Sequence, residues 1–553
     1  MQNIKSTIIL FISVASLSML VSCKKQLDVK NPNQPTLASA STETGVISLA
    51  QGGVYIAGFT ANGLPGGYYD GVVGAFWDGA VGFHELMGDE IGQEAANAYL
   101  NQIGCPFSVT LDNSTVIPNP NSPQSQLTLL RQINLNGNLG QNPLYYEWTF
   151  SYNINNTCNS ILSIVDNVAF SGDANTKINT IKAWCYWWKG YAYSRIGSIY
   201  YAGLINDTAN STNANFLAKE KIIAEANSNF DKASSILSGL TENSDYDDVL
   251  GKLIPQIFQV GKGGILSPAM WIRNINTFEA RNILVNTRVK DMTSAQWASI
   301  ASLTSNGVQV DDLVFTGRSN DNGDFISASD GTVAARATGN PGSISFPVSE
   351  RLIQDFEPGD KRLDNNFIQL STPWIGPSDR GNVFNTRWQL VDGGNGMNGV
   401  VVLSNKNSGD YELYLATTYE ENQLMAAEAK IYTGDIDGGL TLIDEVRDYQ
   451  GAGLAHVSGT GLTLDQAKEE LRRERRVALA FRGFSFYDAR RWGVLDDVSQ
   501  GGGRTGCVVV DNSGNVNTNA TINYNFLDYW DVPDNELAYN PPAAGSDPVK
   551  NPK

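Results

Sequence analysis

Aromatic side chains in a glycine-rich stretch are the first residues of this sequence that could form a binding surface. Tyr68, Tyr69 and Trp77 lie within residues 63–82, and Asp78 directly follows Trp77. Flat aromatic faces stack against the C–H groups of a sugar ring, while nearby carboxylates and amides bind its hydroxyl groups. These four residues are therefore candidate saccharide contacts. The alternative is that Trp77 is a core residue at the start of a helix.

Trp374 is a further candidate of the same kind. It lies in residues 372–377, a segment in which prolines and a glycine exclude the core of a helix. The alternative is that its side chain packs inside the loop and has a structural role. Trp271 and Arg281 fall on an expected helix and are interpreted as structural.

Two dense clusters are also interpreted as structural. The aromatic residues between 184 and 193 repeat at helical spacing, which predicts core packing. The charged residues between 472 and 491 alternate in sign, which favours a network of ion pairs over a binding site. The members are Trp184, Tyr186, Trp187, Trp188, Tyr191 and Tyr193 in the first cluster, and Arg472, Arg473, Glu474, Arg475, Arg476, Asp488, Arg490 and Arg491 in the second.

No catalytic residue is expected. The sequence contains neither a G-x-S-x-G elbow nor a Walker A loop, and His84 and His456 are isolated. The glycines 501, 503 and 506 match a dinucleotide fingerprint formally, but they precede a β-like segment, so the match is dismissed. A surface glycoside hydrolase stays open as an alternative, because any two of the 57 acidic residues could serve as acid and base.

No cofactor is expected either. Asp311, Asp312 and the run 321–324 offer hard oxygen ligands, which leaves structural calcium open, but their spacing fails the EF-hand pattern and favours a solvated loop. Cysteines without C-x-x-C spacing and only two histidines argue against zinc. Cys158 and Cys185 fall in helical patterns and are interpreted as core residues. No disulfide is assigned among Cys105, Cys158, Cys185 and Cys507.

The N-terminus has the pattern of a lipoprotein signal peptide. Lys5 precedes an apolar run, which closes on Leu20-Val21-Ser22-Cys23, similar to a bacterial lipobox. Residues 1–22 are expected to be removed, and Cys23 to be acylated and to anchor the chain. The polar residues 23–45 are interpreted as a tether that lifts the body off the membrane.

The formal net charge of −18 and the lack of a basic patch argue against nucleic-acid binding. No second run of eighteen apolar residues follows the signal segment, so the membrane anchor is expected to be lipid alone.

Helical periodicity dominates the body. A capping box of Thr463 with Gln466 opens one of the expected helices, and Gly434 separates a helix pair that is similar to a tetratricopeptide unit. The expected helices are 148–168, 178–200, 220–237, 418–433, 437–446 and 464–481.

Residues 302–409 differ in composition, because they are rich in Gly, Asn, Asp and Ser. They are interpreted as a loop-rich lobe with short strands such as Val400–Leu403. The predicted fold is mainly α: tetratricopeptide-like helix pairs pack against this irregular lobe in a single domain, residues 46–553. Its helical scaffold covers about 46–300 and 410–500, and a C-terminal tail covers 501–553.

Several segments resemble the SusD/RagB family of outer-membrane nutrient-binding lipoproteins of Bacteroidetes. Residues 349–362 contain an F-x-x-x-D-x-R-like segment, and 421–447 resemble an alanine-rich helix pair. The most specific match is 471–493, with an E-R motif, an A-F-x-G step and D-x-R-R-W-G. Residues 529–541 resemble the terminal I-P-x-x-E-L…N-P signature. The stretch 306–347 departs from the family, which leaves the ligand open.

The resemblance implies a non-catalytic protein at the cell surface, seated as a lid over a SusC-type TonB-dependent transporter. It implies capture of a glycan or, as in some relatives, a peptide, and delivery to that transporter. It also implies that residues around Trp77 contact the ligand. An adhesive lipoprotein without a small ligand is the remaining alternative.

Overall fold

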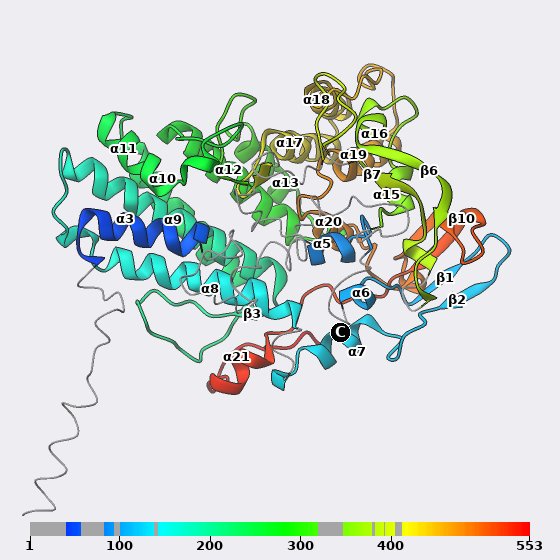
Figure 1. The fold of residues 1–553 in the computed structure, drawn as a ribbon, viewed down its shortest axis with the longest axis horizontal. Coiled ribbons are helices and arrows are strands. Elements are labelled where there is room, and N and C mark those ends of the chain that lie inside the picture. The colour runs from blue at the N-terminus through cyan, green and yellow to red at the C-terminus, as the bar shows by residue number, and fades with distance from the viewer. Residues whose placement is uncertain are drawn as a thin grey trace, which may run out of the picture.

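The computed structural model describes residues 40–56, 82–92, 100–137, 142–318, 347–378, 382–391, 393–403 and 412–553. The fold is mainly α, as predicted (Figure 1). Its strands are short and form one four-stranded sheet and three two-stranded sheets among the described residues. No helix in this part of the chain has both the length and the hydropathy that a membrane span requires.

Long helices pack side by side in one half of the molecule (Figure 1). α9 lies between α8 and α10, and the side chains of Trp184, Trp187 and Trp188 are fully buried on it. Most residues of α9 are buried, the polar Lys177 and Lys189 among them, which fits its central place among the helices. The helices of this half are α3 (Glu43–Gln51), α8 (Pro143–Leu162), α9 (Ala174–Ile199), α10 (Lys219–Ser238), α11 (Ser244–Leu253), α12 (Pro268–Val285) and α13 (Ser294–Thr304).

The predicted core role of this aromatic cluster is confirmed. Phe315 lies against three of its tryptophans, with ring centroids 5.5 Å from Trp184 and 4.8 Å from Trp187. Trp271, also predicted to be structural, is buried and edge-on to Phe315 at 5.2 Å. Cys158 and Cys185 are buried here as free thiols.

The predicted helix pair is present as α17 (Tyr419–Thr433) and α18 (Ile436–Tyr449). Gly434 ends α17 with a φ of +98°, a conformation that glycine adopts without strain. The Thr463–Gln466 capping box opens α19 (Leu464–Ala478) as expected. α19 ends three residues before the predicted boundary at Phe481, which has a φ of +60° and cannot continue a right-handed helix.

A four-stranded antiparallel sheet joins distant parts of the chain. Its order is β2 (Val116–Pro118), β1 (Ser108–Thr110), β10 (Val516–Asn523) and β9 (Arg504–Val510). β9 covers the expected β-like segment and includes Gly506, while Gly501 and Gly503 precede it. The predicted tail 501–553 thus supplies half of this sheet, and it ends with α21 (Asp534–Tyr539).

The predicted loop-rich lobe contains more regular structure than expected. It includes β5 (Thr316–Arg318), α15 (Glu350–Gln354), α16 (Lys361–Asn366), β6 (Phe367–Trp374) and β7 (Thr386–Leu390). β5 pairs with β8 (Glu412–Tyr414), and β6 pairs with β7.

The prediction of a strand at Val400–Leu403 is wrong. These residues form no strand, because the side chain of Asn366 takes the place of a strand partner. Asn366 Nδ2 donates to the carbonyl of Val401 at 2.9 Å, and its Oδ1 accepts from the Leu403 amide at 2.7 Å.

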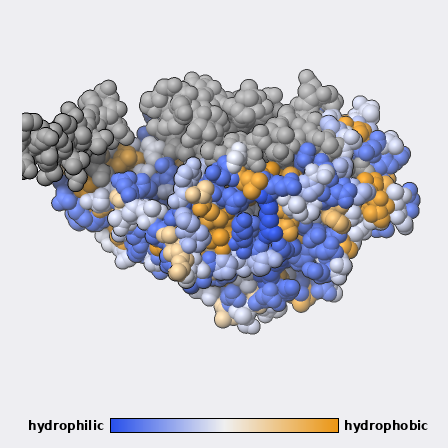
Figure 2. All heavy atoms as spheres, turned by 90° about the horizontal axis from the view of Figure 1, so that it is seen from below, coloured by the Kyte–Doolittle hydropathy of each residue, from blue (hydrophilic) through white to orange (hydrophobic). Residues whose placement is uncertain are grey.

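The molecular surface is predominantly polar on the face seen from below. Figure 2 shows hydrophilic residues over much of this face, with smaller hydrophobic groups between them. Such a mixture is ordinary for a solvated face.

Candidate ligand-binding site

The predicted contacts Tyr68, Tyr69, Trp77 and Asp78, and the predicted acylation site Cys23, lie outside the described residues. Their roles stay predictions. Trp374 is the one predicted contact that the structure describes. It ends β6, with its side chain partly buried.

Trp374 is held on a braced strand end. It pairs in register with Thr386, and the backbone of Gly376 packs so close to the indole that a Cβ there would meet it at 2.9 Å. The Gly376 amide donates to Asn385 Oδ1 at 3.0 Å, and Asn385 Nδ2 donates to the carbonyl of Val510 at 3.0 Å. These bonds fix the strand end against β9, so the partly exposed indole is held in place.

Described residues flank the segment that carries the other predicted contacts on both sides. Before it, Tyr55 packs against Phe258 with ring centroids 5.0 Å apart. After it, α5 (Gly82–Met87) brings Glu85 to the turn before α20 (Ser485–Arg491), where the Gly483 amide and Ser485 Oγ donate to its carboxylate. Gly483 lines a cavity between the two halves of the molecule.

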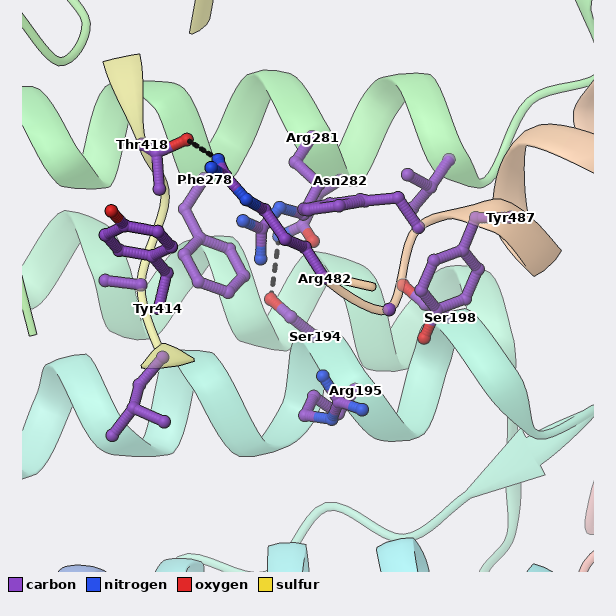
Figure 3. Close-up of a pocket in the computed structure, with 15 residues that line it drawn as sticks. Ser194, Arg195, Ser198, Phe278, Arg281, Asn282, Tyr414, Thr418, Arg482 and Tyr487 are labelled. Carbon is purple, nitrogen blue, oxygen red and sulfur yellow. Dashed lines mark hydrogen bonds between the residues drawn. The ribbon is translucent and has the colours of Figure 1, made fainter. Parts of the chain in front are cut away.

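This cavity is lined from four segments: α9, α12, the chain after β8 and the turn before α20 (Figure 3). Its walls carry Arg195, Arg281 and Arg482 together with aromatic rings. Its volume is about 40 Å³. Space of that size admits a few water molecules and is too small for a sugar ring.

Each of the three arginines is paired with a buried glutamate. Arg281 Nε and Nη2 donate to the two carboxylate oxygens of Glu421, both at 2.5 Å, and its guanidinium lies 4.3 Å from the ring centroid of Phe278. Arg482 Nη2 donates to Glu420 Oε1 at 3.1 Å. Burial alone would raise the pKa of Glu420, but the charge of Arg482 lowers it.

Arg195 lies below the cavity in Figure 3 and forms the third of these arginine–glutamate pairs. Its Nε donates to Glu147 Oε1 at 2.6 Å, and the other Glu147 oxygen lies 3.0 Å from His84 Nε2. Burial alone would raise the pKa of Glu147, but Arg195 and His84 lower it. The cavity is therefore lined by neutralised charge, and it forms a rigid junction between the helical halves.

Arg281 was interpreted as structural from sequence, and its buried ion pair confirms this. The arginine–glutamate pairs themselves were missed. Arg281 and Glu421 are 140 residues apart in sequence, so no local spacing signals their contact.

A second cavity, of about 270 Å³, lies between α8 and residues 204–212 and is rich in asparagine. Its amides hold the loop: Asn155 Nδ2 and Asn159 Nδ2 both donate to the carbonyl of Asn206 at 2.7 Å. Asn156 Oδ1 accepts from the Asn210 amide at 2.7 Å. Because these groups already bind one another, the arrangement is a loop clamp.

Metal chemistry has no support in the described part of the chain. No group of three or more His, Cys, Asp and Glu side chains there could hold a metal ion. Of the residues considered for calcium, the run 321–324 lies outside the described residues, and Asp312 binds Arg273 Nε at 2.7 Å.

Comparison with known proteins finds a family match in the C-terminal part of the chain. The model of the SusD family matches residues 349–543. Over these residues the chain is similar to the SusD family. No curated protein matches this chain.

Solved structures agree with the SusD fold. A SusD-like carbohydrate-binding protein from Bacteroides vulgatus ATCC 8482 is 14% identical, with a TM-score of 0.54 over 92% of this chain and 98% of its own. A SusD superfamily protein from Parabacteroides distasonis ATCC 8503 is also 14% identical, with a TM-score of 0.51 over 93% of this chain and 100% of its own.

The SusD-like motifs of this chain form buried ion pairs. Arg362 of the D-x-R segment donates to Asp360 at 2.7 Å and to Glu474 of the E-R motif at 2.6 Å. Arg475 and Arg491 both bind Asp488 of the D-x-R-R motif. Burial alone would raise the pKa of Asp488, and these two arginines lower it. The predicted structural role of the charged run is confirmed for these residues.

Proposed function

We propose that this SusD-like protein captures a glycan at the outer surface of a bacterial outer membrane and passes it, uncleaved, to a SusC-type TonB-dependent transporter. The observation that carries the proposal is the family match over residues 349–543. A relative of the same fold from Bacteroides vulgatus is described as a carbohydrate-binding protein.

The geometry of Trp374 supports capture by stacking. Its indole is partly exposed at the braced end of β6, so binding a ligand there orders no additional chain. A pre-placed aromatic face binds a sugar ring at low entropic cost. We propose that Trp77, Asp78, Tyr68 and Tyr69 extend this surface. The lipid on Cys23 would hold it at the membrane.

Native affinity electrophoresis of the full chain in detergent, with a panel of polysaccharides in the gels, tests glycan capture. We expect retardation by at least one polysaccharide. We expect Trp374→Ala and Trp77→Ala each to weaken it about tenfold, because each removes a stacking face.

Tyr539→Ala is the matched control. Tyr539 is 86% exposed on α21, away from β6 (Figure 1), so its removal should leave retardation unchanged. Lack of retardation by every polysaccharide would contradict glycan capture and favour a peptide ligand or an adhesive role.

An assay of reducing ends on the same samples separates capture from hydrolysis. A capture protein releases no new reducing ends, whereas a glycoside hydrolase does. Co-purification of a TonB-dependent transporter with the detergent-extracted protein from its native membrane tests the proposed partner.

A further inference from the structure

The largest of the described cavities is lined by none of the residues considered so far as a ligand contact. Its volume is about 530 Å³, within the range of small-molecule sites. It lies between α17, α19 and the chain segments that follow α12 and α20, and we call it the α19 groove. Tyr432, Trp492, Lys290, Lys468, Arg288 and Arg472 are among the residues that line it.

The groove is separate from the arginine cavity of Figure 3. The two sites share no lining residue: residues Phe278 to Val285 of α12 line the cavity, whereas Arg288, Val289 and Lys290, which follow α12, line the groove. Arg490 lies beside the cavity, where its Nη2 donates to the carbonyl of Val285 at 2.8 Å and its Nη1 donates to that of Ser198 at 2.6 Å.

Two supported aromatic rings line the groove. Tyr432 stacks on Trp297 with ring centroids 4.8 Å apart and an interplanar angle of 15°. Trp492 has the guanidinium of Arg491 over its ring at 4.4 Å. Both rings are partly exposed, and each is held by its neighbour. Trp297 stacks on Tyr432 and Lys468 lies over the same ring, so Trp492 is the ring better suited to the apolar face of a sugar.

The arginines of the groove are already paired. Arg288 makes two bonds of 2.9 Å to the carboxylate of Asp496, and buried Arg491 binds Glu428 and Asp488. Arg472 lies against Glu469.

The lysines are less well paired. Lys468 Nζ is 3.9 Å from Asp465 and 4.9 Å from the ring centroid of Tyr432. Lys290 is exposed and forms no ion pair within the described residues. A protein of net charge −18 thus presents two under-neutralised ammonium groups in one groove.

The indole N–H of Trp492 lacks a hydrogen-bond acceptor in the described part of the chain, and its Nε1 is buried. Trp492 differs from the fully buried tryptophans of the core because its side chain lines the groove. A buried donor without an acceptor is unfavourable, so an oxygen atom placed here is favoured.

We propose that the α19 groove binds a saccharide unit that carries a carboxylate or a sulfate ester. The anionic group pairs with Lys290 and Lys468, a ligand oxygen accepts from Trp492, and the sugar ring packs against the partly exposed ring of Trp492. The choice of a saccharide rests on the proposed function, and the choice of an anion rests on the groove itself.

Isothermal titration of the full chain in detergent tests the proposal with glucuronate, glucose 6-sulfate, glucose and inorganic sulfate. We expect glucuronate or glucose 6-sulfate to bind at least about tenfold more tightly than glucose, with an affinity that falls as salt is added. Inorganic sulfate should bind more weakly than either, because it lacks a ring. Equal binding of sulfate would reduce the groove to an adventitious anion site and overturn the proposal.

Substitutions locate the site. Lys290→Met with Lys468→Met should weaken binding of the anionic sugar about tenfold or more while leaving the melting temperature near that of the wild type, since both side chains reach solvent. Trp492→Phe keeps a ring, removes the donor and should weaken binding by a smaller factor. Unchanged affinity in the double variant would overturn the proposal.

The two proposals fail separately. Polysaccharide retardation that depends on Trp374 should be unaffected by Lys290→Met with Lys468→Met. If no polysaccharide retards the protein in the gels while glucuronate binds through these lysines, glycan capture by stacking is contradicted. The proposal that the α19 groove binds an anionic sugar is then still supported.

Discussion

Arg491 of α20 and Glu428 of α17 form a two-armed ion pair in which neither side chain is exposed to solvent. Arg491 Nη1 donates to Glu428 Oε1 at 2.5 Å, and Nη2 donates to Oε2 at 2.8 Å. Arg491 Nε also donates to Asp488 Oδ1, at 2.6 Å. Burial alone would lower the pKa of Arg491, and these carboxylates raise it. The pair joins the helix pair α17–α18 to the D-x-R-R-W-G motif.

Removal of one partner from this pair should destabilise the fold. Glu428→Ala leaves a buried guanidinium with only Asp488 for compensation, and we expect the free energy of unfolding to fall by about 3–5 kcal/mol. Chemical denaturation measures it. Glu469→Ala, at an exposed glutamate of neighbouring α19, is the control and should cost less than about 1 kcal/mol. A loss of that small size for Glu428→Ala would contradict the structural role of the motif.

Glu90 should make stability depend on pH. Burial raises the pKa of Glu90 well above its usual value of 4.5, and the nearby carboxyl of Glu85 raises it further. Because the folded state holds this proton more tightly than the unfolded state, the contribution of Glu90 to stability is complete below about pH 4.5. It is lost as the pH rises through the pKa of the folded state, by at most about 1.4 kcal/mol per pH unit.

Glu90→Gln removes this titration. The new amide oxygen can still accept from the Phe481 amide, which donates to Glu90 Oε2 at 3.0 Å. Denaturation from about pH 5 to about pH 8 should show that the variant gains stability relative to wild type as pH rises. Glu242→Gln, at an exposed position, should follow the wild type. Parallel curves for Glu90→Gln and wild type would refute the raised pKa.

Cys23 should carry the membrane anchor. Cys23→Ser removes the thiol that lipidation requires, so the chain should no longer incorporate labelled palmitate and should leave the membrane fraction. Cys105→Ser is the control, because Cys105 is a buried free thiol within the folded body. Palmitate labelling that survives Cys23→Ser would place the anchor elsewhere.

Local patterns in the sequence were sufficient for the helices. The 3.6-residue period, the Thr463–Gln466 capping box and Gly434 predicted α8, α9, α10, α17, α18 and α19 to within a few residues, because helix hydrogen bonds and caps join neighbours in sequence. The largest boundary errors are at α8, which begins five residues before the expected start at residue 148 and ends six residues before the expected end at residue 168. One boundary of α19 is set by a distant contact. Phe481 is turned into a left-handed conformation and its amide binds Glu90.

Long-range pairings could not be predicted in this way. β1 pairs with β10 more than four hundred residues away, and Asn366 displaces the strand expected at Val400–Leu403. Of the predicted ligand contacts, the structure describes only Trp374, and it places this residue on a strand. The α19 groove had no sequence signal, because Lys290 and Lys468 meet there from separate helices.

The sequence by itself therefore determined the helices, the resemblance to the SusD family and the residue types suited to stacking, since each depends on order along the chain. Only the tertiary structure decided which charges neutralise one another. Arginines 195, 281 and 491 are all charged in sequence, and burial beside a particular glutamate makes each of them structural. Lys290 and Lys468 differ from them because the fold leaves their charges under-neutralised beside an open groove.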